Sequence, residues 1–531
     1  MKIILLIKHI YSELIKDLFK ILKIFFLIKK ITVKNPIGKI LINNEYHEDF
    51  SWINYLIGHI LKLRGYEVKF LVCNGNHYCE RMSHTFVRPN CKLCFYGNVI
   101  RLKSFGHDYI TSKKTNSLND IKISNLKDFD YSAILSENQS EHIVQGVNLS
   151  NLINVSFLHY FKGKVKLCEK SLLITKKIFL SAVQNLVNFS KVIKDYNPQK
   201  IITINGKNIQ TGTLYELSKY KNIDSYTWDV FNQGFKCMFS KNEIAHNQNI
   251  SKDLWLELSK KTLSNEDKLK VKDYMRNQLL GLNTTFKFHD DSSKADPGII
   301  FNLLGLDSRK KIISIFPNQD WDSTALCVDD VYKNQFDFLE NMILLSRDFS
   351  DYNFVLRPHP VDSVRSKHIR STRPFNIYLN EKFQDEIPKN FLILKPETKL
   401  NSYMLAKISS HRIVYASTLG LEFSFLRLKT IVAGDAFYKN RGFTIDLKNK
   451  NDLQKILKEN ISNPLLDDKD FDLLEKFIFI SKFRKLFDLP IFEKTKFPFS
   501  KISNNIFLSN KCINNIADYV LDKRNYLDLD K

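Results

Sequence analysis

Short apolar runs that end in polar loops recur along the chain and predict buried strands. These runs occur at 38–42, 67–72, 200–204, 223–229, 310–316, 353–356, 413–416 and 429–433. Stretches with helical periodicity lie between several of them, among them 50–63, 211–220 and 334–349. Because strands that alternate with helices are typical of parallel sheets, the pattern predicts an α/β fold.

The strand runs fall into two groups, which predicts two Rossmann-like domains facing across a cleft. A chain of 531 residues is longer than one hydrophobic core usually organises, in agreement with two domains. We expect an N-terminal domain at 35–244 and a second domain at 309–490. A separate helix at 1–34, a helical linker region at 245–308 and a helical tail at 491–531 complete the predicted organisation.

The first 34 residues combine eight lysines with isoleucine, leucine and phenylalanine. Apolar residues recur at steps of three and four, at Ile3, Ile7, Ile10, Leu14, Leu18, Ile21, Phe25 and Ile28. This spacing predicts a basic amphipathic helix on an anionic membrane surface, the alternative being a helix packed on the protein's own surface. No apolar run approaches the ~20 residues that span a bilayer, and no small-residue cleavage site follows. We therefore expect a cytoplasmic protein, peripherally associated with the inner face of the cytoplasmic membrane.

The formal net charge is +23, from 80 Lys and Arg against 57 Asp and Glu. This excess favours anionic partners such as nucleotide phosphates, acidic glycans or phospholipid. It is spread along the chain rather than gathered into one basic block, and the sequence carries no homeodomain, zinc-finger or RRM pattern. We therefore expect no nucleic-acid partner.

Four of the eight cysteines fall within an insertion at 73–94 that follows the second predicted strand. They are Cys73, Cys79, Cys91 and Cys94, and the last two form a C-x-x-C pair. Such a pair can supply two ligands of a structural zinc, with the other two cysteines, or one of the nearby histidines, completing a tetrahedral site. Free thiols in a reducing compartment are the favoured interpretation, and disulfides apply only to an exported protein.

Polar residues follow the predicted strands of the N-terminal domain, where open sheets bind their ligands. His47, Glu48 and Asp49 lie in the first such loop, Asn205 and Lys207 in a later one, and Asp229 at the tip of the next strand. A reaction at a hydroxyl group, here called the acceptor, requires a base near that group. We rank Asp229 and Glu48 first as that base, with His47, Asp49, Asn205 and Lys207 on the acceptor side; solvated loop charges are the alternative.

Two motifs in the second domain follow apolar strands and carry groups that suit a phosphate. The first is Arg-Pro-His-Pro at 357–360, and the second places Ser417, Thr418, Gly420 and Glu422 at a helix start. Arginine, histidine, hydroxyl groups and helix-start N–H groups all donate hydrogen bonds to anions. Asn318 and Asp322 follow the first strand of this domain, and Tyr438 follows a later strand.

These residues resemble the capsular-polysaccharide biosynthesis glycosyltransferases, the family that contains the Kdo transferases of bacterial capsule linkers. The resemblance covers roughly 310–450 and rests on the Arg-Pro-His-Pro loop, Ser417-Thr418-x-Gly420-x-Glu422, and Gly434-x-x-Phe437-Tyr438 with Gly442-x-Thr444-x-Asp446. It implies a GT-B fold and a nucleotide-sugar donor, with CMP-activated Kdo or a similar acidic sugar favoured. A lipid-linked or growing polysaccharide would be the acceptor. A CDP-glycerol-type polyol-phosphate transferase and a non-catalytic assembly protein are the alternatives.

Within this interpretation, His359 donates to the departing phosphate, which gains charge as the glycosidic bond breaks, and no metal is required. Arg357 faces the phosphate or pairs within its own domain. Ser417 and Thr418 donate to the same phosphate or cap a helix. Glu422 accepts from the ribose or offsets the helix dipole. Asn318 and Asp322 face the cleft, and Tyr438 is either a wall for the base or a core aromatic.

Overall fold

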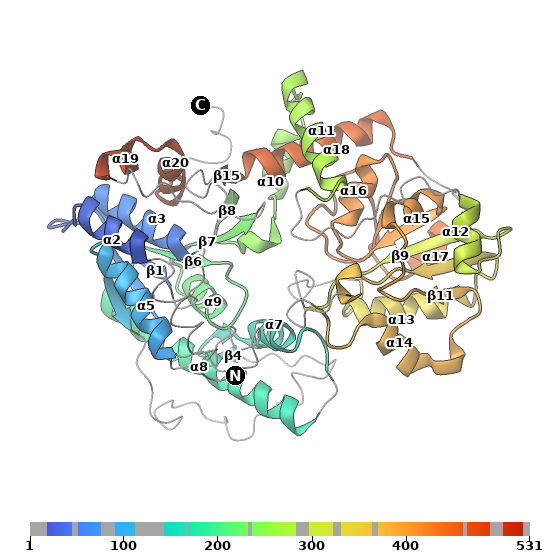
Figure 1. Cartoon of the computed structure of the whole chain (residues 1–531), viewed down its shortest axis with the longest axis horizontal. Coiled ribbons are helices and arrows are strands. Elements are labelled where there is room, and N and C mark those ends of the chain that lie inside the picture. Colours follow the sequence, from blue (N-terminus) through green and yellow to red (C-terminus); the bar gives the residue numbers. More distant parts are fainter. Residues whose placement is uncertain are drawn as a thin grey trace. The chain divides into compact units, whose positions relative to one another are not determined.

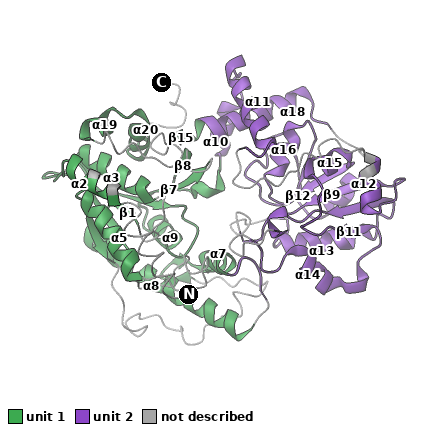
Figure 2. Ribbon diagram, in the orientation of Figure 1, with its two compact units in different colours: residues 1–160, 166–249, 484–531 green, residues 161–165, 250–483 purple. Residues whose placement is uncertain are grey.

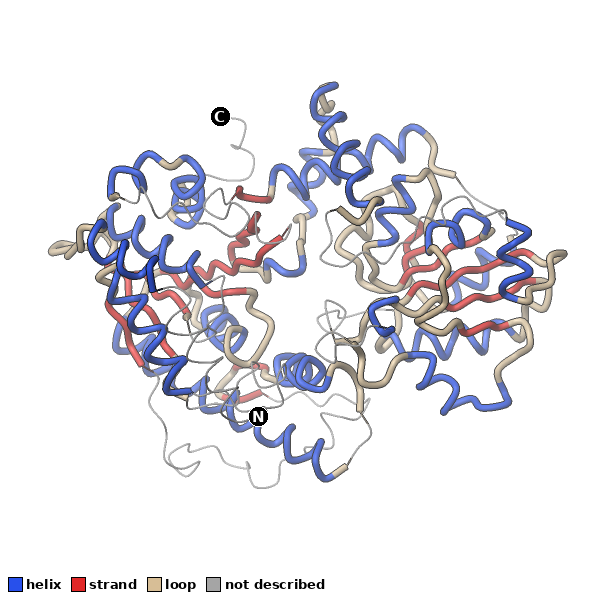
Figure 3. The backbone as a smooth tube through the Cα atoms, viewed as in Figure 1, coloured by secondary structure: helices blue, strands red, loops and turns tan. Residues whose placement is uncertain are grey.

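The computed structural model describes residues 18–44, 51–75, 91–111, 143–165, 168–231, 236–282, 297–321, 331–363, 370–459, 465–488 and 503–523. The chain divides into two compact units (Figure 2). Unit 1 comprises 1–160, 166–249 and 484–531, and unit 2 comprises 161–165 and 250–483. Each unit has one main sheet with helices around it (Figure 3). The prediction of two α/β domains is therefore confirmed, whereas the cleft between them stays a prediction.

Unit 1 contains a seven-stranded sheet in the order β15-β8-β7-β6-β1-β2-β3. The strands are β1 (Lys39–Asn43), β2 (Glu67–Val72), β3 (Asp108–Thr111), β6 (Lys200–Ile204), β7 (Asp224–Phe231), β8 (Lys236–Lys241) and β15 (Leu486–Asp488). The five strands from β3 to β7 pair in parallel, whereas β8 is antiparallel to both of its neighbours. The chain adds β2 and β3 on one side of β1 and then places β6 and β7 on the other, which is a Rossmann-type order.

Helices surround this sheet (Figure 1). They are α2 (Leu18–Leu27), α3 (Trp52–Leu63), α5 (Cys91–Ser104), α7 (Ser150–Phe161), α8 (Glu169–Tyr196) and α9 (Gly212–Tyr220), with a small hairpin of β4 (Ile143–Val144) and β5 (Val147–Asn148) before α7. α3 is apolar on nearly all sides and almost fully buried. A helix of this composition is stable only inside a core, which here lies between the sheet and the C-terminal helices.

The N-terminal helix packs on its own protein in the region that is described. α2 buries Ile21, Ile24 and Ile28 in the core of unit 1 and contacts α5. Leu18 and Phe25, which we predicted on the same face as Ile21 and Ile28, are exposed. The predicted membrane-facing stripe is therefore wrong over this helix, because three isoleucines of one face fit the core better than the membrane surface. Residues 1–17 of the prediction lie outside the described part of the chain.

The C-terminal segment belongs to unit 1 rather than forming a separate tail. β15 extends the sheet beyond β8, and α19 (Asn504–Ser509) and α20 (Lys511–Val520) contact α3. α20 buries Ile513, Ile516, Ala517 and Val520, the spacing of one helix face. The predicted boundary at 490/491 thus differs from the observed one, because this apolar stripe has no other core to join.

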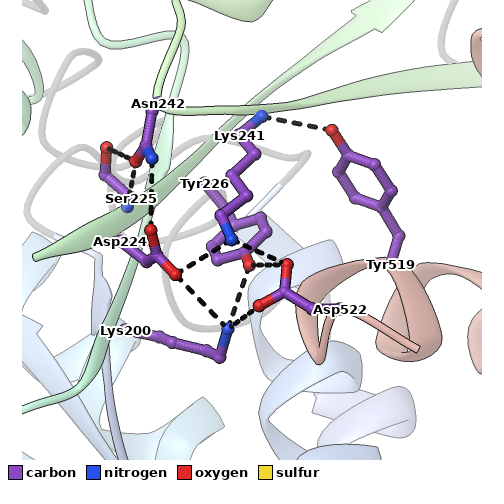
Figure 4. Close-up of polar contacts among 8 residues, drawn as sticks. All are labelled: Lys200, Asp224, Ser225, Tyr226, Lys241, Asn242, Tyr519 and Asp522. Carbon is purple, nitrogen blue, oxygen red and sulfur yellow. Dashed lines mark hydrogen bonds and ion pairs between the residues drawn. The ribbon is translucent and has the colours of Figure 1, made fainter. Parts of the chain in front are cut away.

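A charged cluster fixes the end of α20 to the amino ends of the strands. Asp522 accepts hydrogen bonds from Lys200 Nζ at 2.5 Å, Lys241 Nζ at 2.9 Å and the Tyr226 hydroxyl at 2.7 Å (Figure 4). Asp224 lies 2.9 Å from Lys241 Nζ in the same cluster. Two lysines are thereby balanced by two carboxylates, and the C-terminal helix is held against β6, β7 and β8.

Unit 2 contains a six-stranded sheet in the order β11-β10-β9-β12-β13-β14. The strands are β9 (Lys311–Phe316), β10 (Tyr352–Leu356), β11 (Phe391–Ile393), β12 (His411–Val414), β13 (Ile431–Val432) and β14 (Ile445–Asp446). Every neighbouring pair in this sheet is parallel. Numbered along the chain, the order is 3-2-1-4-5-6, the arrangement of dinucleotide-binding Rossmann domains.

The helices of unit 2 include the region that we predicted to be a linker. They are α10 (Lys252–Leu258), α11 (Asn265–Leu279), α12 (Pro297–Leu304), α13 (Gln335–Ser346), α14 (Phe375–Phe383), α15 (Ser402–Ile408), α16 (Leu419–Phe425), α17 (Asn451–Lys458) and α18 (Asp468–Phe479). Trp255, Val271, Met275 and Ile300, from the first three of them, are buried in the core of this unit. The predicted linker at 245–308 therefore differs from the structure, because its apolar residues complete a domain core.

Candidate functional site

The carboxyl edge of the unit 2 sheet gathers most of the residues predicted to bind a donor. The chain leaves β9 toward β10 on one side and later returns to β12 on the other, so the strand order reverses between β9 and β12. The loops 317–321 and 415–418 flank this switch point. In open α/β sheets the ligand crevice lies at such a point, outside the carboxyl ends of the strands.

The loop after β9 is held by the side chain of Gln335, at the start of α13. Gln335 Oε1 accepts from the Asn318 N–H at 2.7 Å, and Gln335 Nε2 donates to the Asn318 carbonyl at 2.8 Å. The Asn318 side chain in turn accepts from the Gln319 N–H at 2.9 Å. The predicted donor residue Asn318 therefore shapes its own loop, while its neighbour Asp322 lies outside the described residues.

The sequence interpretation missed Asp320, a buried carboxylate in the same loop. Its Oδ2 accepts from the Lys164 N–H at 2.9 Å. Burial raises the pKa of Asp320 to about 6, and the charge of Asp362 raises it further against that hydrogen bond. Gly163 approaches the carboxylate so closely that a Cβ there would lie 2.7 Å from both of its oxygens. Asp320 thus positions the short segment 161–165 in unit 2.

The same segment brings two lysines onto aromatic rings of unit 2. Lys162 Nζ lies 3.9 Å from the centre of the Trp321 ring, and Lys164 Nζ lies 4.9 Å from that of Phe336. Thr372 fixes the backbone with an N–H that donates to the Lys162 carbonyl at 2.7 Å. Lys162 is buried and Lys164 is partly exposed, so Lys164 is the cation of this segment that suits an anionic ligand.

Asp362 is a second buried carboxylate that the sequence interpretation did not identify. It lies in the turn η8 (Pro360–Ser363) after the Arg-Pro-His-Pro loop, and its Oδ1 accepts from the Ser371 N–H at 2.9 Å. Burial raises its pKa, although hydrogen bonds from Ser371 and Gln319 oppose the shift. Asp320 and Asp362 thus follow adjacent strands, and the charge of Asp362 contributes to the raised pKa of Asp320. The only signal in the sequence was their place after predicted strands.

His359 lies at this edge with a defined tautomer. Its Nδ1 accepts a hydrogen bond from the Val361 N–H at 3.2 Å, and the ring is partly exposed. A neutral imidazole that accepts at Nδ1 carries its proton on Nε2. The predicted role of His359 as a hydrogen-bond donor to a phosphate is therefore compatible with this geometry.

Arg357 does not face a phosphate site in this structure. Its guanidinium is buried and donates to the carbonyl oxygens of Lys395 and Pro396 at 3.3 Å and of Leu400 at 3.4 Å. Burial lowers its pKa to about 10. The donor role assigned to Arg357 is therefore corrected to a structural one, because the side chain bonds to the loop that follows β11.

The loop after β12 keeps one hydroxyl exposed and one buried. Thr418 is exposed and makes no capping hydrogen bond to α16, whereas the buried Ser417 Oγ accepts from the Leu419 N–H at 3.3 Å. The Tyr438 hydroxyl donates to the Ser417 carbonyl at 2.5 Å. Tyr438 is fully buried, so its predicted role as a wall for the base is corrected to support of this loop. A Cβ at Gly420 would lie 2.1 Å from the Tyr438 hydroxyl, which explains the glycine.

Glu422 is also an interior residue. Its two carboxylate oxygens accept from Gln278 Nε2 at 3.0 Å and from the Tyr403 hydroxyl at 2.6 Å. Burial raises its pKa against these two hydrogen bonds. The predicted contact with a ribose is therefore corrected: Glu422 joins α16 to α11 and α15 within unit 2.

In unit 1 the strand order reverses between β1 and β6, and the predicted acceptor residues lie there. Asn43 at the end of β1 donates to Thr203 Oγ1 at 3.2 Å and to the Gln210 carbonyl at 3.0 Å, which ties the two strand ends together. Asn205 accepts from Thr211 Oγ1 at 3.0 Å and from the Lys207 N–H at 3.2 Å. Asn205 and Lys207 therefore lie at the switch point, as predicted. His47, Glu48 and Asp49 lie outside the described residues.

Asp229 is paired with a histidine that the sequence interpretation missed. His246 Nδ1 lies 2.7 Å from Asp229 Oδ2, and the N–H of Val230 donates to Asp229 Oδ1 at 2.8 Å. His246 lies 17 residues later in the chain, in the turn η6 (Ala245–Asn247). The antiparallel pairing of β7 and β8 returns the chain along β7 and places His246 beside Asp229. No pattern in the sequence indicates this contact.

The cysteine insertion is described only in part. Cys73 Sγ accepts from the Gly75 N–H at 3.2 Å, and Gly75 packs against Cys91. Cys91 and Cys94 lie one turn apart at the start of α5, and neither is in a disulfide. Cys79 and both nearby histidines lie outside the described residues. Among those described, no three candidate ligands form a metal cluster, and the zinc interpretation stays a prediction.

A shallow pocket of about 200 Å³ lies at the amino end of β9, lined by Lys310, Lys311 and Ser410 among others, on the edge opposite the loops above.

Within the described ranges, no helix has both the length and the apolar character that crossing a membrane requires.

Comparisons with known proteins gave structural likenesses only. No protein-family model and no curated protein matches the sequence. Thermosulfurimonas dismutans KpsC, a β-Kdo 2,7-transferase, is similar at 12% identity over 64% of this chain and 90% of that chain, with a TM-score of 0.34. UDP-GlcNAc 2-epimerase of Methanocaldococcus jannaschii is similar at 12% identity over 83% and 98%, with a TM-score of 0.26. S. aureus MnaA with UDP is similar at 11% identity over 92% and 97%, with a TM-score of 0.27. The assignment of two Rossmann-like units therefore rests on the strand order within each of them.

Proposed function

We propose that this protein is a nucleotide-sugar-dependent glycosyltransferase of surface-polysaccharide biosynthesis. The observation that supports it is the carboxyl edge of the unit 2 sheet. A 3-2-1-4-5-6 sheet there carries His359 with its proton on Nε2, the exposed Thr418 hydroxyl and, beside them, the partly exposed Lys164. Such donors stabilise a phosphate leaving group without a metal. Together with the motif resemblance, this favours a CMP-activated acidic sugar such as Kdo as the donor.

Nucleotide preference is the first test. Isothermal titration with CMP, CDP, UDP and GDP should give the tightest binding for CMP. The matched variants are His359→Ala, which removes the proposed hydrogen-bond donor to the phosphate, and Lys389→Ala. Lys389 is an exposed cation before β11, at the opposite edge of the sheet. We expect His359→Ala to weaken CMP binding or to lower the rate of transfer, and Lys389→Ala to change neither. Binding of UDP or GDP in place of the cytidine nucleotides would refute the CMP donor.

Sugar release from CMP-Kdo, measured with and without acceptor lipid, tests the activity itself. Acceptor-dependent release is the expected result. Transfer of glycerol phosphate from CDP-glycerol would instead assign the polyol-phosphate reaction, and binding of every nucleotide without turnover would assign a non-catalytic protein.

We also propose that unit 1 associates with an anionic membrane surface through the outer face of α2. Phe26 is 78% exposed and Phe25 50% exposed, and the exposed cations Lys29 and Lys30 follow directly. Aromatic side chains flanked by lysines suit an anionic bilayer interface. Phe25→Ser with Phe26→Ser should reduce co-sedimentation with phosphatidylglycerol-containing vesicles. Leu303→Ser, a similarly exposed apolar residue in unit 2, should leave it unchanged. Equal sedimentation of both variants would refute this proposal.

A further inference from the structure

The Asp229–His246 pair is held rigidly at one end of the unit 1 sheet. Asp229 lies on β7, and its strand neighbour Thr227, two positions earlier, shares its face. Thr227 Oγ1 accepts from the Ala245 N–H at 2.7 Å and donates to the Glu243 carbonyl at 2.6 Å. These two hydrogen bonds fix the turn that carries His246 against β7. The imidazole is therefore positioned by the fold rather than by a flexible loop.

The charge of Asp229 determines which nitrogen of His246 carries a proton. Although burial by itself would raise the pKa of Asp229, the hydrogen bond with His246 and the charges of His246 and Lys207 lower it. An ionised carboxylate only accepts hydrogen bonds, so the neighbouring Nδ1 of His246 must be the donor. In the neutral ring the lone pair then lies on Nε2.

That Nε2 atom is buried and has no hydrogen-bond partner among the described residues. The side chain as a whole keeps 21% of its surface exposed, so the ring borders solvent. Leaving a buried polar atom unpaired costs on the order of 1–3 kcal/mol, so most buried polar atoms in folded proteins have a partner. A base oriented by a carboxylate, with its second nitrogen unpaired, is the arrangement that activates hydroxyl groups in acyl transfer.

We propose that His246 is the general base of the transfer reaction and that Asp229 is its positioning residue. This rests on the proposed glycosyltransferase function. As the acceptor oxygen forms its bond to the anomeric carbon, the hydroxyl proton passes to His246 Nε2. The bond from that carbon to its leaving group breaks, and the electron pair departs with the leaving group. The proton is then released to solvent. Asp229 itself, which we ranked as the base from sequence, stays ionised and holds the ring.

The charged groups that the structure places by this base are Asp229 on β7 and, beyond it, Lys207 in the loop after β6. The carboxylate stabilises the positive charge that the ring gains during transfer.

The test uses the full chain, the donor nucleotide sugar found above and alkyl β-glycosides as hydroxyl acceptors. His246→Gln should lower kcat by about 10²- to 10⁴-fold, with the dissociation constant of the free nucleotide within about twofold of the wild type. Asp229→Asn should lower kcat and leave the dissociation constant of the free nucleotide unchanged, a separation that loss of the fold of unit 1 would not give. Asn247→Ala, exposed in the same turn, is the control and should leave both unchanged.

Nitrogen-15 NMR of the histidines gives a second readout that needs no substrate. The neutral ring of His246 in the wild type should carry its proton on Nδ1 and its lone pair on Nε2, and Asp229→Asn should change that tautomer population. A protonated Nε2 in the wild type, or a His246→Gln enzyme with more than half of the wild-type kcat, overturns the assignment and leaves the proposed function standing. A wild type that transfers from no donor overturns the proposed function and this base together.

Discussion

The hydroxyl of Tyr438 donates a hydrogen bond to the carbonyl oxygen of Ser417 across 2.5 Å, which links the loop after β13 to the loop after β12 at the switch point. Gly420 makes room for this contact, since a Cβ there would also lie 3.0 Å from Val414 Cγ2. The position of the exposed Thr418 hydroxyl depends on this packing.

Gly420→Ala should therefore destabilise unit 2 by about 1–3 kcal/mol, the usual cost of overpacking a filled core. Tyr438→Phe removes the hydroxyl that lies closest and should partly rescue the variant. Urea denaturation of the two single variants and the double variant measures the coupling. Strictly additive effects would contradict the steric account, because residues in contact are expected to couple.

Asp320→Asn should stabilise unit 2 above about pH 6. The folded-state pKa of Asp320, about 6, exceeds its ordinary value of 3.8 because of burial, opposed by the Lys164 N–H and reinforced by Asp362. The folded state thus binds more protons than the unfolded state between these values, so stability falls as pH rises from about 4 to 6. The cost of the ionised form approaches about 3 kcal/mol above that window.

The difference in unfolding free energy between wild type and Asp320→Asn, measured from pH 4 to pH 8, checks this. The difference should grow with pH and then level off. Asp320→Ala also removes the acceptor of the Lys164 N–H, so this variant should not show the higher unfolding free energy of Asp320→Asn. A difference that does not vary with pH would contradict the burial of an ionisable carboxyl at this position.

Acid should weaken unit 1 through His59. Burial lowers the pKa of His59 from 6.5 to about 4, with a smaller contribution from Lys62, although the hydrogen bond that His59 Nε2 donates to Asn504 Oδ1 opposes the shift. The unfolded state binds more protons between these values, so stability is full above about pH 6.5 and falls as the pH drops toward 4. The loss approaches about 3 kcal/mol.

Hydrogen exchange of the α3 amides, compared between pH 7 and pH 5, reports on this unit directly. His59→Phe removes the titrating group and should flatten the pH dependence, at the cost of the contact with Asn504. The same pH dependence in both proteins would show that another group carries the acid sensitivity.

Asp522→Asn should loosen the C-terminal helix of unit 1 modestly. Although burial acts to raise it, hydrogen bonds from Lys200, Lys241 and Tyr226 bring the pKa of Asp522 to about 2. The stabilisation is present above about pH 4 and is lost as the pH falls toward 2. Because the side chain is 43% exposed, solvent screening limits the effect to roughly 1 kcal/mol.

Thermal denaturation at pH 7 and pH 3 checks this, with Lys523→Ala, an exposed neighbour, as the control. The difference between Asp522→Asn and wild type should shrink at pH 3, since the wild-type carboxylate is then losing its charge advantage. An equal difference at both values would assign the effect to packing rather than to charge.

The sequence by itself determined the central strands of both sheets and the side of each sheet that carries polar loops, whereas it did not indicate β3, β8, β11 or β15. Buried parallel strands require contiguous apolar runs, so 67–72 and 200–204 match β2 and β6 in full, and the runs at 310–316 and 353–356 nearly match β9 and β10. The residues just after these runs lie at the carboxyl edges for the same reason. His359, Asn205 and Lys207 were therefore found from local pattern alone.

Only the tertiary structure decided what those residues contact. In the sequence, Arg357, Glu422 and Tyr438 look like ligand-binding residues beside their strands. In the structure each is buried and hydrogen-bonded to protein groups distant in the chain. His246 joined Asp229 through the return of a hairpin, and the C-terminal helix joined unit 1 because its apolar stripe fits the α3 surface. Hydrophobic periodicity reports which face of an element is buried, whereas the partner that buries it is set by the packing of the whole chain.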